Sequence, residues 1–432
     1  MKNPFRNHQG IDVEQREADL SDASFARKIG SFFNPAPQRE KVLRHEDFNA
    51  AGDVYYATVS AGYKVAQRIL WLFFVFFMVF SIATNYKEIT YDNFFYLVKD
   101  FTSAADAGNN TYETLSYESD SRQSFVLYRG GVATVSPSKL SIFTATGRRT
   151  LNESSSFSSP YAISSNKYVL IYDTSGTTFS LYNSFARVYT ETLDYPVTGA
   201  CLSEDGSFAI VTRSADSRSV ICTYNKQFHK TAELRADYYV FDIEMNTDKK
   251  SLSFLSYDAG NGTGRTVLSV RDLGTMEEID RVELDGEFPL ACGYLEKDRF
   301  AVITDRYIRI FDSVFETVEI SDDYSGGNIT GYCLNEHGVA VSATVSSKNC
   351  IFAFDKSGKL LYNDFVSFQV SDIWVCESYL FLQTERGVTR FNTKTEEEES
   401  LISGHGKLLV YNANTALICG ESKAEYLIFK NN

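Results

Sequence analysis

The chain has 432 residues, with 42 Lys and Arg against 56 Asp and Glu, so its formal net charge is −14. A surface this acidic excludes a nucleic-acid partner and argues against a domain that lies flat on anionic lipid. The length would accommodate two or three domains, but 14% aromatic and 23% charged residues with only seven prolines indicate one large, strand-rich domain beside smaller segments.

Residues 1–64 are predicted to form a mostly disordered cytoplasmic tail. Residues 1–20 are polar and have no periodic pattern, which is typical of disorder. A short amphipathic helix is expected near 22–33, because four apolar residues recur there at the spacing of one helix face: Phe25, Ile29, Phe32 and Phe33. A helix of three turns is unstable alone in water, so these side chains would contact a cytoplasmic partner or the membrane, unless the helix has no role.

Residues 69–83 form an uncharged, apolar run that divides the tail from the rest of the chain. A helix of this length covers about 23 Å, less than the roughly 30 Å hydrocarbon core, so flanking residues must extend it. We therefore predict a transmembrane helix over 65–86, with Trp71 and Tyr86 at the two interfaces. The alternatives are a signal peptide and a buried helix of a soluble domain. Against a signal peptide, the run begins far from residue 1 and no small-residue cleavage motif follows it.

The distribution of basic residues predicts the orientation of this helix. Within about thirty residues of the apolar run, five basic residues precede it and only two follow it: Arg39, Lys41, Arg44, Lys64 and Arg68, then Lys87 and Lys99. Because positive charge is retained on the cytoplasmic side, we expect a single-pass plasma-membrane protein with a cytoplasmic N-terminus and an extracellular C-terminal domain. Residues 87–111 would form a juxtamembrane helix or linker.

From residue 112 to 432 the chain shows short runs of alternating apolar and polar residues separated by turns, which predict β-strands. Run after run ends in an aromatic residue followed by Asp or Asn. There are five clear copies and three looser ones: Tyr182-Asn183, Tyr224-Asn225, Phe311-Asp312, Phe354-Asp355 and Phe391-Asn392, then Phe143-Thr144, Arg271-Asp272 and Phe429-Lys430. Successive copies lie 39, 42, 47, 40, 43, 37 and 38 residues apart, so a unit of about 41 residues repeats eight times.

Each unit contains three or four predicted strands. In the third unit they cover 199–203, 208–212, 220–224 and 231–234, and the turn Glu204-Asp205-Gly206 joins the first two. Four short antiparallel strands in every forty residues are typical of a β-propeller blade, and such sheets must stack in a ring to bury both of their faces. The expected fold class is therefore all-β, a β-propeller preceded by one transmembrane helix and the disordered tail.

The last unit determines the number of blades, because it supplies only three strands, 407–411, 416–419 and 425–429. Residues 112–117 would supply its fourth strand and close the ring by pairing the two ends of the domain, which leaves no exposed edge. This arrangement gives eight blades. Seven blades is the alternative if the first or last unit is irregular, and a pair of β-sandwiches is the rival architecture.

All seven cysteines lie within the predicted domain: Cys201, Cys222, Cys292, Cys333, Cys350, Cys376 and Cys419. Each is part of an apolar strand pattern. Their odd number and the absence of a CxxC or Cys/His pair argue against a zinc site or a complete disulfide framework. We predict small, buried, reduced thiols.

No pattern indicates a catalytic, cofactor-binding or metal site, and we assign no residue to any of the three. His229, His337 and His405 lie in different units and are expected to be turn residues. The glycine-rich stretch 260–264 links two predicted strands, which indicates a hairpin loop rather than a phosphate cradle. The acidic runs 322–323 and 396–399 are expected to be solvated surface.

The repeat resembles the class of WD40-like and quinoprotein-like propellers, on turns such as Ser203-Glu204-Asp205-Gly206 and strand ends such as Ile310-Phe311-Asp312. The whole layout is similar to an uncharacterised family of Gram-positive bacterial membrane proteins with one span and a propeller ectodomain. The chain departs from both classes of propeller, because its only tryptophans, Trp71 and Trp374, provide neither Trp-Asp pairs nor tryptophan-docking repeats. The resemblance implies a domain that holds a ligand or partner on one face.

We expect a non-enzymatic scaffold, a membrane-anchored extracytoplasmic propeller that binds a protein or cell-wall polymer in the bacterial envelope. The alternative is an envelope glycan hydrolase or lyase with carboxylates in the central channel. Such an enzyme needs two carboxylates roughly 5–10 Å apart in a pocket, whereas a scaffold channel would be lined by hydroxyl and apolar groups. The predicted innermost segments 241–244 and 370–373 contribute few acids, which favours the scaffold.

Overall fold

The computed structural model describes residues 50–85, 91, 94–95 and 114–430, apart from 121, 175, 249, 263 and 297. The chain divides into two compact units, Met1–Phe101 and Thr102–Asn432. The amphipathic helix predicted near 22–33 lies outside the described residues, and so does most of the linker predicted over 87–111.

Helix α4 (Ala50–Asn85) contains the apolar run of the first unit. Residues Gly62–Thr84 are long and apolar enough to cross a membrane, and none of the segment is buried against other described residues. They form a candidate membrane span, although a signal sequence has the same properties. The helix begins at Ala50, before the span predicted over 65–86, so its first residues belong to the segment predicted as the tail. Hydropathy locates the apolar span, whereas the helical backbone extends through any adjoining residues that tolerate it.

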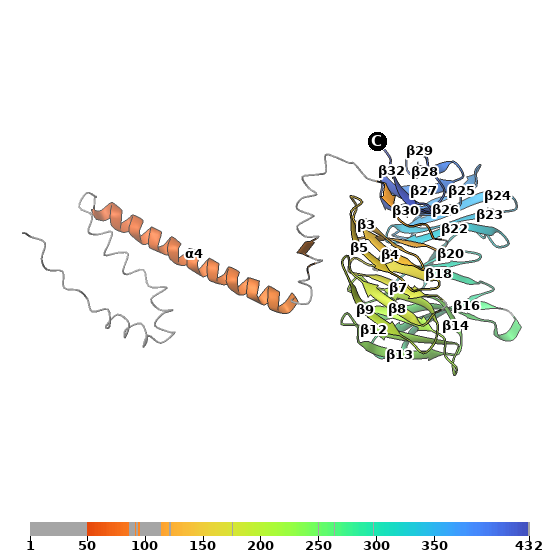
Figure 1. The fold of residues 1–432 in the computed structure, drawn as a ribbon, viewed down its shortest axis with the longest axis horizontal. Helices are drawn as coiled ribbons and strands as arrows, with labels where there is room; N and C mark the ends of the chain where they lie inside the picture. The colour runs from red at the N-terminus through yellow and green to blue at the C-terminus, as the bar shows by residue number, and fades with distance from the viewer. Residues whose placement is uncertain are drawn as a thin grey trace, which may run out of the picture. The chain divides into compact units, whose positions relative to one another are not determined.

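The second unit is an eight-bladed β-propeller, in which each blade is a four-stranded antiparallel sheet (Figure 1). Blades are numbered here in chain order and their strands from the inside outward. Blade 1 contains β2 (Ser124–Tyr128), β3 (Gly131–Val135), β4 (Lys139–Phe143) and β5 (Arg149–Ser154). Blade 2 contains β6 (Pro160–Ser164), β7 (Val169–Asp173), β8 (Thr178–Tyr182) and β9 (Arg187–Thr192). Blade 3 contains β10 (Val197–Leu202), β11 (Phe208–Thr212), β12 (Ser219–Tyr224) and β13 (Lys230–Ala236).

The remaining blades repeat the same order. Blade 4 contains β14 (Tyr239–Asn246), β15 (Ser251–Asp258), β16 (Arg265–Asp272) and β17 (Glu278–Asp285), with the 3-10 turn η1 (Gly260–Gly262) between β15 and β16. Blade 5 contains β18 (Pro289–Glu296), β19 (Arg299–Thr304), β20 (Ile308–Phe311) and β21 (Thr317–Ile320). Blade 6 contains β22 (Asn328–Asn335), β23 (Gly338–Val345), β24 (Lys348–Asp355) and β25 (Leu360–Val366). Blade 7 contains β26 (Asp372–Cys376), β27 (Tyr379–Thr384), β28 (Gly387–Asn392) and β29 (Glu398–Ile402).

Blade 8 is built from both ends of the domain. Its first three strands are β30 (Lys407–Asn412), β31 (Thr415–Cys419) and β32 (Lys423–Ile428), and the fourth is β1 (Leu115–Ser116), which pairs with β32 through Leu115 and Ala424. Figure 1 shows this strand in orange among the blue strands of blade 8. The predicted ring closure and the preferred count of eight blades are confirmed, and the seven-bladed and β-sandwich alternatives are wrong.

The hydrophobic core lies between the blades. Eight clusters of buried side chains each join one pair of adjacent blades, including blades 8 and 1, where Leu115 and Leu417 pack with Val132 and Phe143. Every residue of β11 and β12 is buried, whereas the outermost strand β13 alternates. Each sheet is therefore covered on both faces by its neighbours. All seven cysteines are buried and free, as predicted.

The two faces of the propeller carry different loops. On one, here called the crossover face, the chain passes from the fourth strand of a blade to the first strand of the next and from the second strand to the third. The opposite face, the turn face, carries the turns between the first and second and between the third and fourth strands. The Asp and Asn residues of the repeat begin the turns between the third and fourth strands, which lie on the turn face.

Candidate binding site at the crossover face

A cavity of about 1020 Å³ occupies the centre of the ring. It is the propeller channel, because the innermost strand of every blade, from β2 to β30, contributes to its lining. Tyr161, Phe241 and Tyr332 line it and keep 49%, 43% and 44% of their surface exposed. The channel is therefore open to solvent beside three aromatic side chains.

Four consecutive blades have a β-bulge at the crossover end of their innermost strand. The register shifts between Val197 and Gly199 in blade 3, and at the equivalent position in blades 4, 5 and 6, which leaves one extra residue in each strand: Thr198, Phe241, Leu290 and Thr330. All four residues line the channel. The innermost strands of blades 1, 2 and 7 have no such shift. Bulges redirect side chains and are frequent beside functional sites, so they distinguish this half of the ring.

The bulge in blade 4 places Phe241 in an exposed aromatic patch, which consists of Phe241, Tyr257 and Phe288. The ring centroids of Phe241 and Phe288 are 5.0 Å apart in an edge-to-face arrangement, and Tyr257 lies 5.0 Å from Phe288. Phe288 is 37% exposed. Edge-to-face contacts hold aromatic rings in a defined arrangement, so the patch presents rigid apolar surface to solvent next to the channel.

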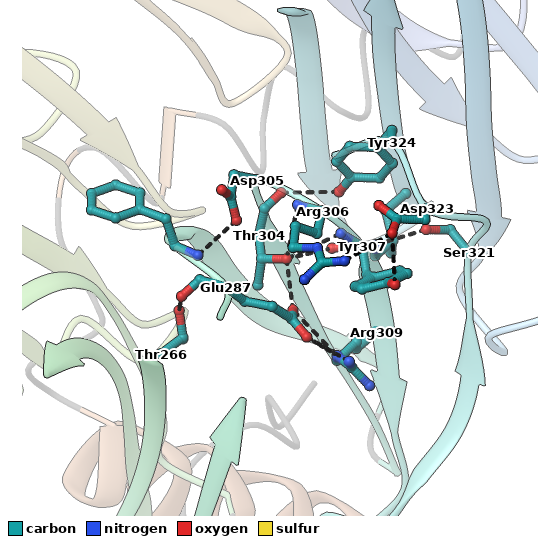
Figure 2. Close-up of polar contacts among 12 residues, drawn as sticks. Thr266, Glu287, Thr304, Asp305, Arg306, Tyr307, Arg309, Ser321, Asp323 and Tyr324 are labelled. Atoms are coloured by element: carbon teal, nitrogen blue, oxygen red, sulfur yellow. Dashed lines mark hydrogen bonds and ion pairs between the residues drawn. The ribbon is translucent and has the colours of Figure 1, made fainter. Parts of the chain in front are cut away.

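A buried polar network fixes the segment that carries Phe288 (Figure 2). Glu287, only 2% exposed, forms an ion pair with Arg309 and accepts a hydrogen bond from Thr304 Oγ1 at 2.8 Å. Its backbone oxygen accepts a bond of 2.7 Å from Thr266 Oγ1 in blade 4. The Phe288 amide donates to Asp305 Oδ1 at 2.7 Å. These bonds from blades 4 and 5 hold the segment before β18 in place and so preorganise the patch.

The channel is lined by acidic groups. Five carboxylic acids and one basic residue contribute to it: Glu204, Asp242, Glu244, Glu336, Asp372 and Lys407. Lys407 Nζ lies 2.8 Å from Asp372 Oδ2, so the one channel cation among the described residues is already paired. Of the other four acids, Asp242 and Glu244 lie on β14, and Glu204 and Glu336 lie in the first-to-second turns of blades 3 and 6, at the turn-face end of the channel. The expectation of a channel with few acids is therefore wrong, because strand and turn residues that looked sparse in each unit converge from several blades.

Asp242 and Glu244 differ in how they are held. Asp242 Oδ2 accepts a hydrogen bond of 2.8 Å from the Cys292 amide of blade 5, whereas no ion pair or hydrogen bond to the Glu244 carboxyl occurs in the described part of the chain. Burial raises the pKa of Asp242 to about 6. Burial, with the neighbouring charges of Asp242 and Glu204, raises the pKa of Glu244 to about 8. A positive charge that enters near Glu244 would thus favour the ionised form of its carboxyl group near neutral pH.

The arrangement suits the binding of positive charge better than hydrolysis. Asp242 and Glu244 are two residues apart on β14, so their side chains leave the same strand about 7 Å from each other. Glycoside hydrolysis needs carboxyl groups that flank the scissile bond, whereas both of these come from one wall of the channel. No group of three His, Cys, Asp or Glu side chains in the described part of the chain is arranged to hold a metal ion.

Among the described residues, the three histidines, the glycine-rich stretch and the acidic runs that the sequence singled out do not line the channel. His229, His337 and His405 lie in three separate loops, and the stretch 260–264 joins β15 to β16 as the predicted hairpin loop. Glu399 contradicts the prediction of solvated surface for 396–399. It pairs with Arg390, which is 4% exposed, because the outer strand β29 lies over the seam with blade 8.

Sequence reasoning missed both the bulges and the aromatic patch. The one local signal for the bulges is a Thr-Gly pair at Thr198-Gly199 and again at Thr330-Gly331. The patch has no such signal, because Phe241, Tyr257 and Phe288 belong to three different strands or loops and resemble ordinary core residues in the sequence.

Fold and repeat define the protein as a β-propeller preceded by a candidate membrane helix. It belongs to a family of unknown function (DUF5711), whose profile matches residues 107–415. No curated protein matches the chain by sequence.

Several solved structures are similar in fold. The computationally designed Ika8 protein has a TM-score of 0.57 at 11% identity, over 74% of this chain and 100% of that one. Sqt1 of Saccharomyces cerevisiae has a TM-score of 0.52 at 11% identity, over 74% and 98%. BamB from Moraxella catarrhalis has a TM-score of 0.50 at 12% identity, over 73% and 98%. At these identities the likeness shows the fold alone.

Proposed function

We propose that the protein is a membrane-anchored scaffold of the bacterial envelope, which holds a partner protein on the crossover face of an extracytoplasmic propeller. The observation that carries the proposal is the aromatic patch beside the open, acid-lined channel. Exposed aromatic clusters that are rigid before binding are typical centres of protein interfaces. The helix Gly62–Thr84 would provide the anchor, and the excess of basic residues before it supports a cytoplasmic N-terminus.

The alternatives are a cell-wall polymer as the partner and glycan hydrolysis as the activity. Aromatic rings also stack on sugars, so the patch by itself fits a polymer too. The protein partner is favoured because the aromatic patch adjoins a channel rich in carboxyl groups, which the basic side chains of a protein would complement. Hydrolysis would need a second, unpaired carboxyl group across the channel from Glu244, and that of Asp372 in blade 7 is paired with Lys407.

The test is crosslinking of the full chain in intact cells with a membrane-impermeant reagent, followed by purification. A protein partner should crosslink to the wild type, and the double substitution Phe241→Ala and Phe288→Ala should reduce its recovery at least about tenfold, as expected for hot-spot residues. Ile402→Ala is the matched control, because Ile402 is 92% exposed on β29, outside the channel lining and the patch.

Three outcomes would each contradict a different part of the proposal. Equal recovery with the double variant and with Ile402→Ala contradicts docking on the crossover face. A partner that is captured only by a membrane-permeant reagent contradicts the extracytoplasmic orientation. Sedimentation of the full chain with purified wall material, again lost in the double variant, would replace the protein partner by a wall polymer.

A further inference from the structure

The aromatic patch and the channel carboxyl groups form one continuous surface. Phe241 belongs to both, because it contacts Phe288 in the patch and lines the channel next to Asp242. Tyr161 and Tyr332 line the same channel, and Asp242 contributes to the raised pKa of Tyr332, whose main cause is burial. An occupant of the patch would therefore place its neighbouring groups at the acidic wall.

Two carboxyl groups of the channel wall have no basic partner among the described residues, those of Asp242 and Glu244, and the one lysine of the lining is bound to Asp372. Asp242 Oδ2 accepts the Cys292 amide. Glu204 and Glu336 lie in turns at the turn-face end of the channel, where Glu204 accepts the Asn166 amide and Glu336 lies 3.8 Å from His337 Nε2. A cation that enters the channel beside the patch would gain the carboxyl groups of Asp242 and Glu244 as partners, in a site where less water screens the interaction than at the protein surface.

Resting on the proposed function, we infer that the partner docks through a basic segment, with lysine or arginine side chains in the channel and an apolar residue of the same segment on the aromatic patch. Charge complementarity selects this occupant. An acidic segment would be repelled by the channel, and a purely apolar segment would leave its carboxyl groups desolvated without a partner. Tyrosine rings along the channel wall also suit a cationic side chain.

Docking of this kind depends on pH. The titratable groups that act on Glu244 are Asp242 on the same strand and Glu204 in blade 3, and Glu244 in turn acts on the thiols of Cys201 and Cys292. Burial raises the pKa of both thiols well above the usual value, so they stay neutral. As the pH rises from 6 to 8, Asp242 and then Glu244 lose their protons while lysine stays charged. The affinity for a basic segment should rise over this range.

The experiment uses the purified full chain in detergent and a fluorescein-labelled peptide of four lysines and one tryptophan, with fluorescence anisotropy as the readout. Binding should weaken as salt rises, and Glu244→Gln should weaken it roughly fivefold or more at pH 8, as expected for one lost charge contact. Glu244→Gln should also reduce the gain in affinity between pH 7 and pH 8. The matched control is Glu319→Gln, which removes the same charge from the exposed outer strand β21.

A peptide with glutamine in place of lysine should not bind. Equal affinity of the lysine peptide for Glu244→Gln, Glu319→Gln and the wild type would overturn the inference, and so would binding of neutral chitotetraose in place of the peptide. Failure of this inference can be told apart from failure of the proposed function. If the Phe241→Ala and Phe288→Ala variant still loses the native crosslinked partner, docking on the crossover face remains supported, but without a basic segment.

Discussion

Glu287 shows how the position of a single residue is decided by contacts that are remote in sequence. Its carboxylate is buried, which would be costly if it were not paired with Arg309 and Thr304. These partners lie 22 and 17 residues further along the chain. The guanidinium of Arg309 also lies 5.1 Å from the centre of the Tyr307 ring. The sequence presents Glu287 only as an acidic residue before a strand, and its burial follows from the contact between blades 4 and 5.

Glu287→Ala should lower the free energy of unfolding by about 3 kcal/mol, because it leaves Arg309 without its partner in a half-buried position. Urea denaturation of the full chain in detergent measures the change. Glu296→Ala in the same blade is the control: the Glu296–Lys356 pair is 2.9 Å long but its side chains are 46% and 57% exposed, so the loss should stay below about 1 kcal/mol. If both variants lose the same free energy of unfolding, the burial of Glu287 does not strengthen its ion pair with Arg309.

At the scale of the element, the repeated Asp or Asn at the end of the third strand has a specific task. Its side-chain oxygen accepts backbone N–H groups of the turn that follows, as Asp312 Oδ1 does from Val314 at 3.0 Å and Glu316 at 2.9 Å. The same pattern occurs in blades 2 to 7, at Asn183, Asn225, Asp272, Asp312, Asp355 and Asn392. The repeat was visible in the sequence because each turn is a local structure with its own residue requirement.

Asp355→Ala should destabilise the domain by about 1–2 kcal/mol, because the amides of Ser357 and Lys359 lose their acceptor. Asp355→Asn should be nearly neutral, since asparagine fills the equivalent position in blades 2, 3 and 7. Thermal unfolding of both variants, followed by circular dichroism, compares them. A loss of the same size in Asp355→Asn would indicate that the charge of Asp355, rather than its turn geometry, is what matters.

At the scale of the whole molecule, stability depends on closure of the ring between blades 8 and 1. Leu115 is 1% exposed within the cluster that joins these two blades. The Tyr117 hydroxyl donates to the Gly420 carbonyl at 2.7 Å, and that of Tyr426 donates to the Ala145 carbonyl at 3.2 Å. Arg390 binds the carbonyl oxygen of Lys430 at 2.7 Å and so fixes the end of the last strand to blade 7. A strand of only two residues, β1, thus covers the edge of β32.

Leu115→Ala should lower the free energy of unfolding by about 2–4 kcal/mol, because it opens a cavity at the seam and weakens the pairing that closes the ring. Ser116→Ala, at the exposed neighbour in the same strand, should change it by less than about 0.5 kcal/mol. Urea denaturation measures the change in the free energy of unfolding for both variants. If Leu115→Ala unfolds at the same urea concentration as Ser116→Ala, closure by β1 contributes little to stability.

The sequence by itself determined the repeat, the eight blades, the strand that closes them and the apolar helix, because strand periodicity, turn residues and hydropathy are properties of neighbouring residues. The third unit shows how far this reaches: strands predicted over 208–212 and 220–224 are found at Phe208–Thr212 and Ser219–Tyr224. Only the tertiary structure decided the site. Each bulge forms between two strands of one blade, and only the closed ring brings the four extra residues into one channel. The aromatic patch and the acidic channel combine residues of different blades, and the ionisation of Glu244 depends on burial that exists only once the ring has formed.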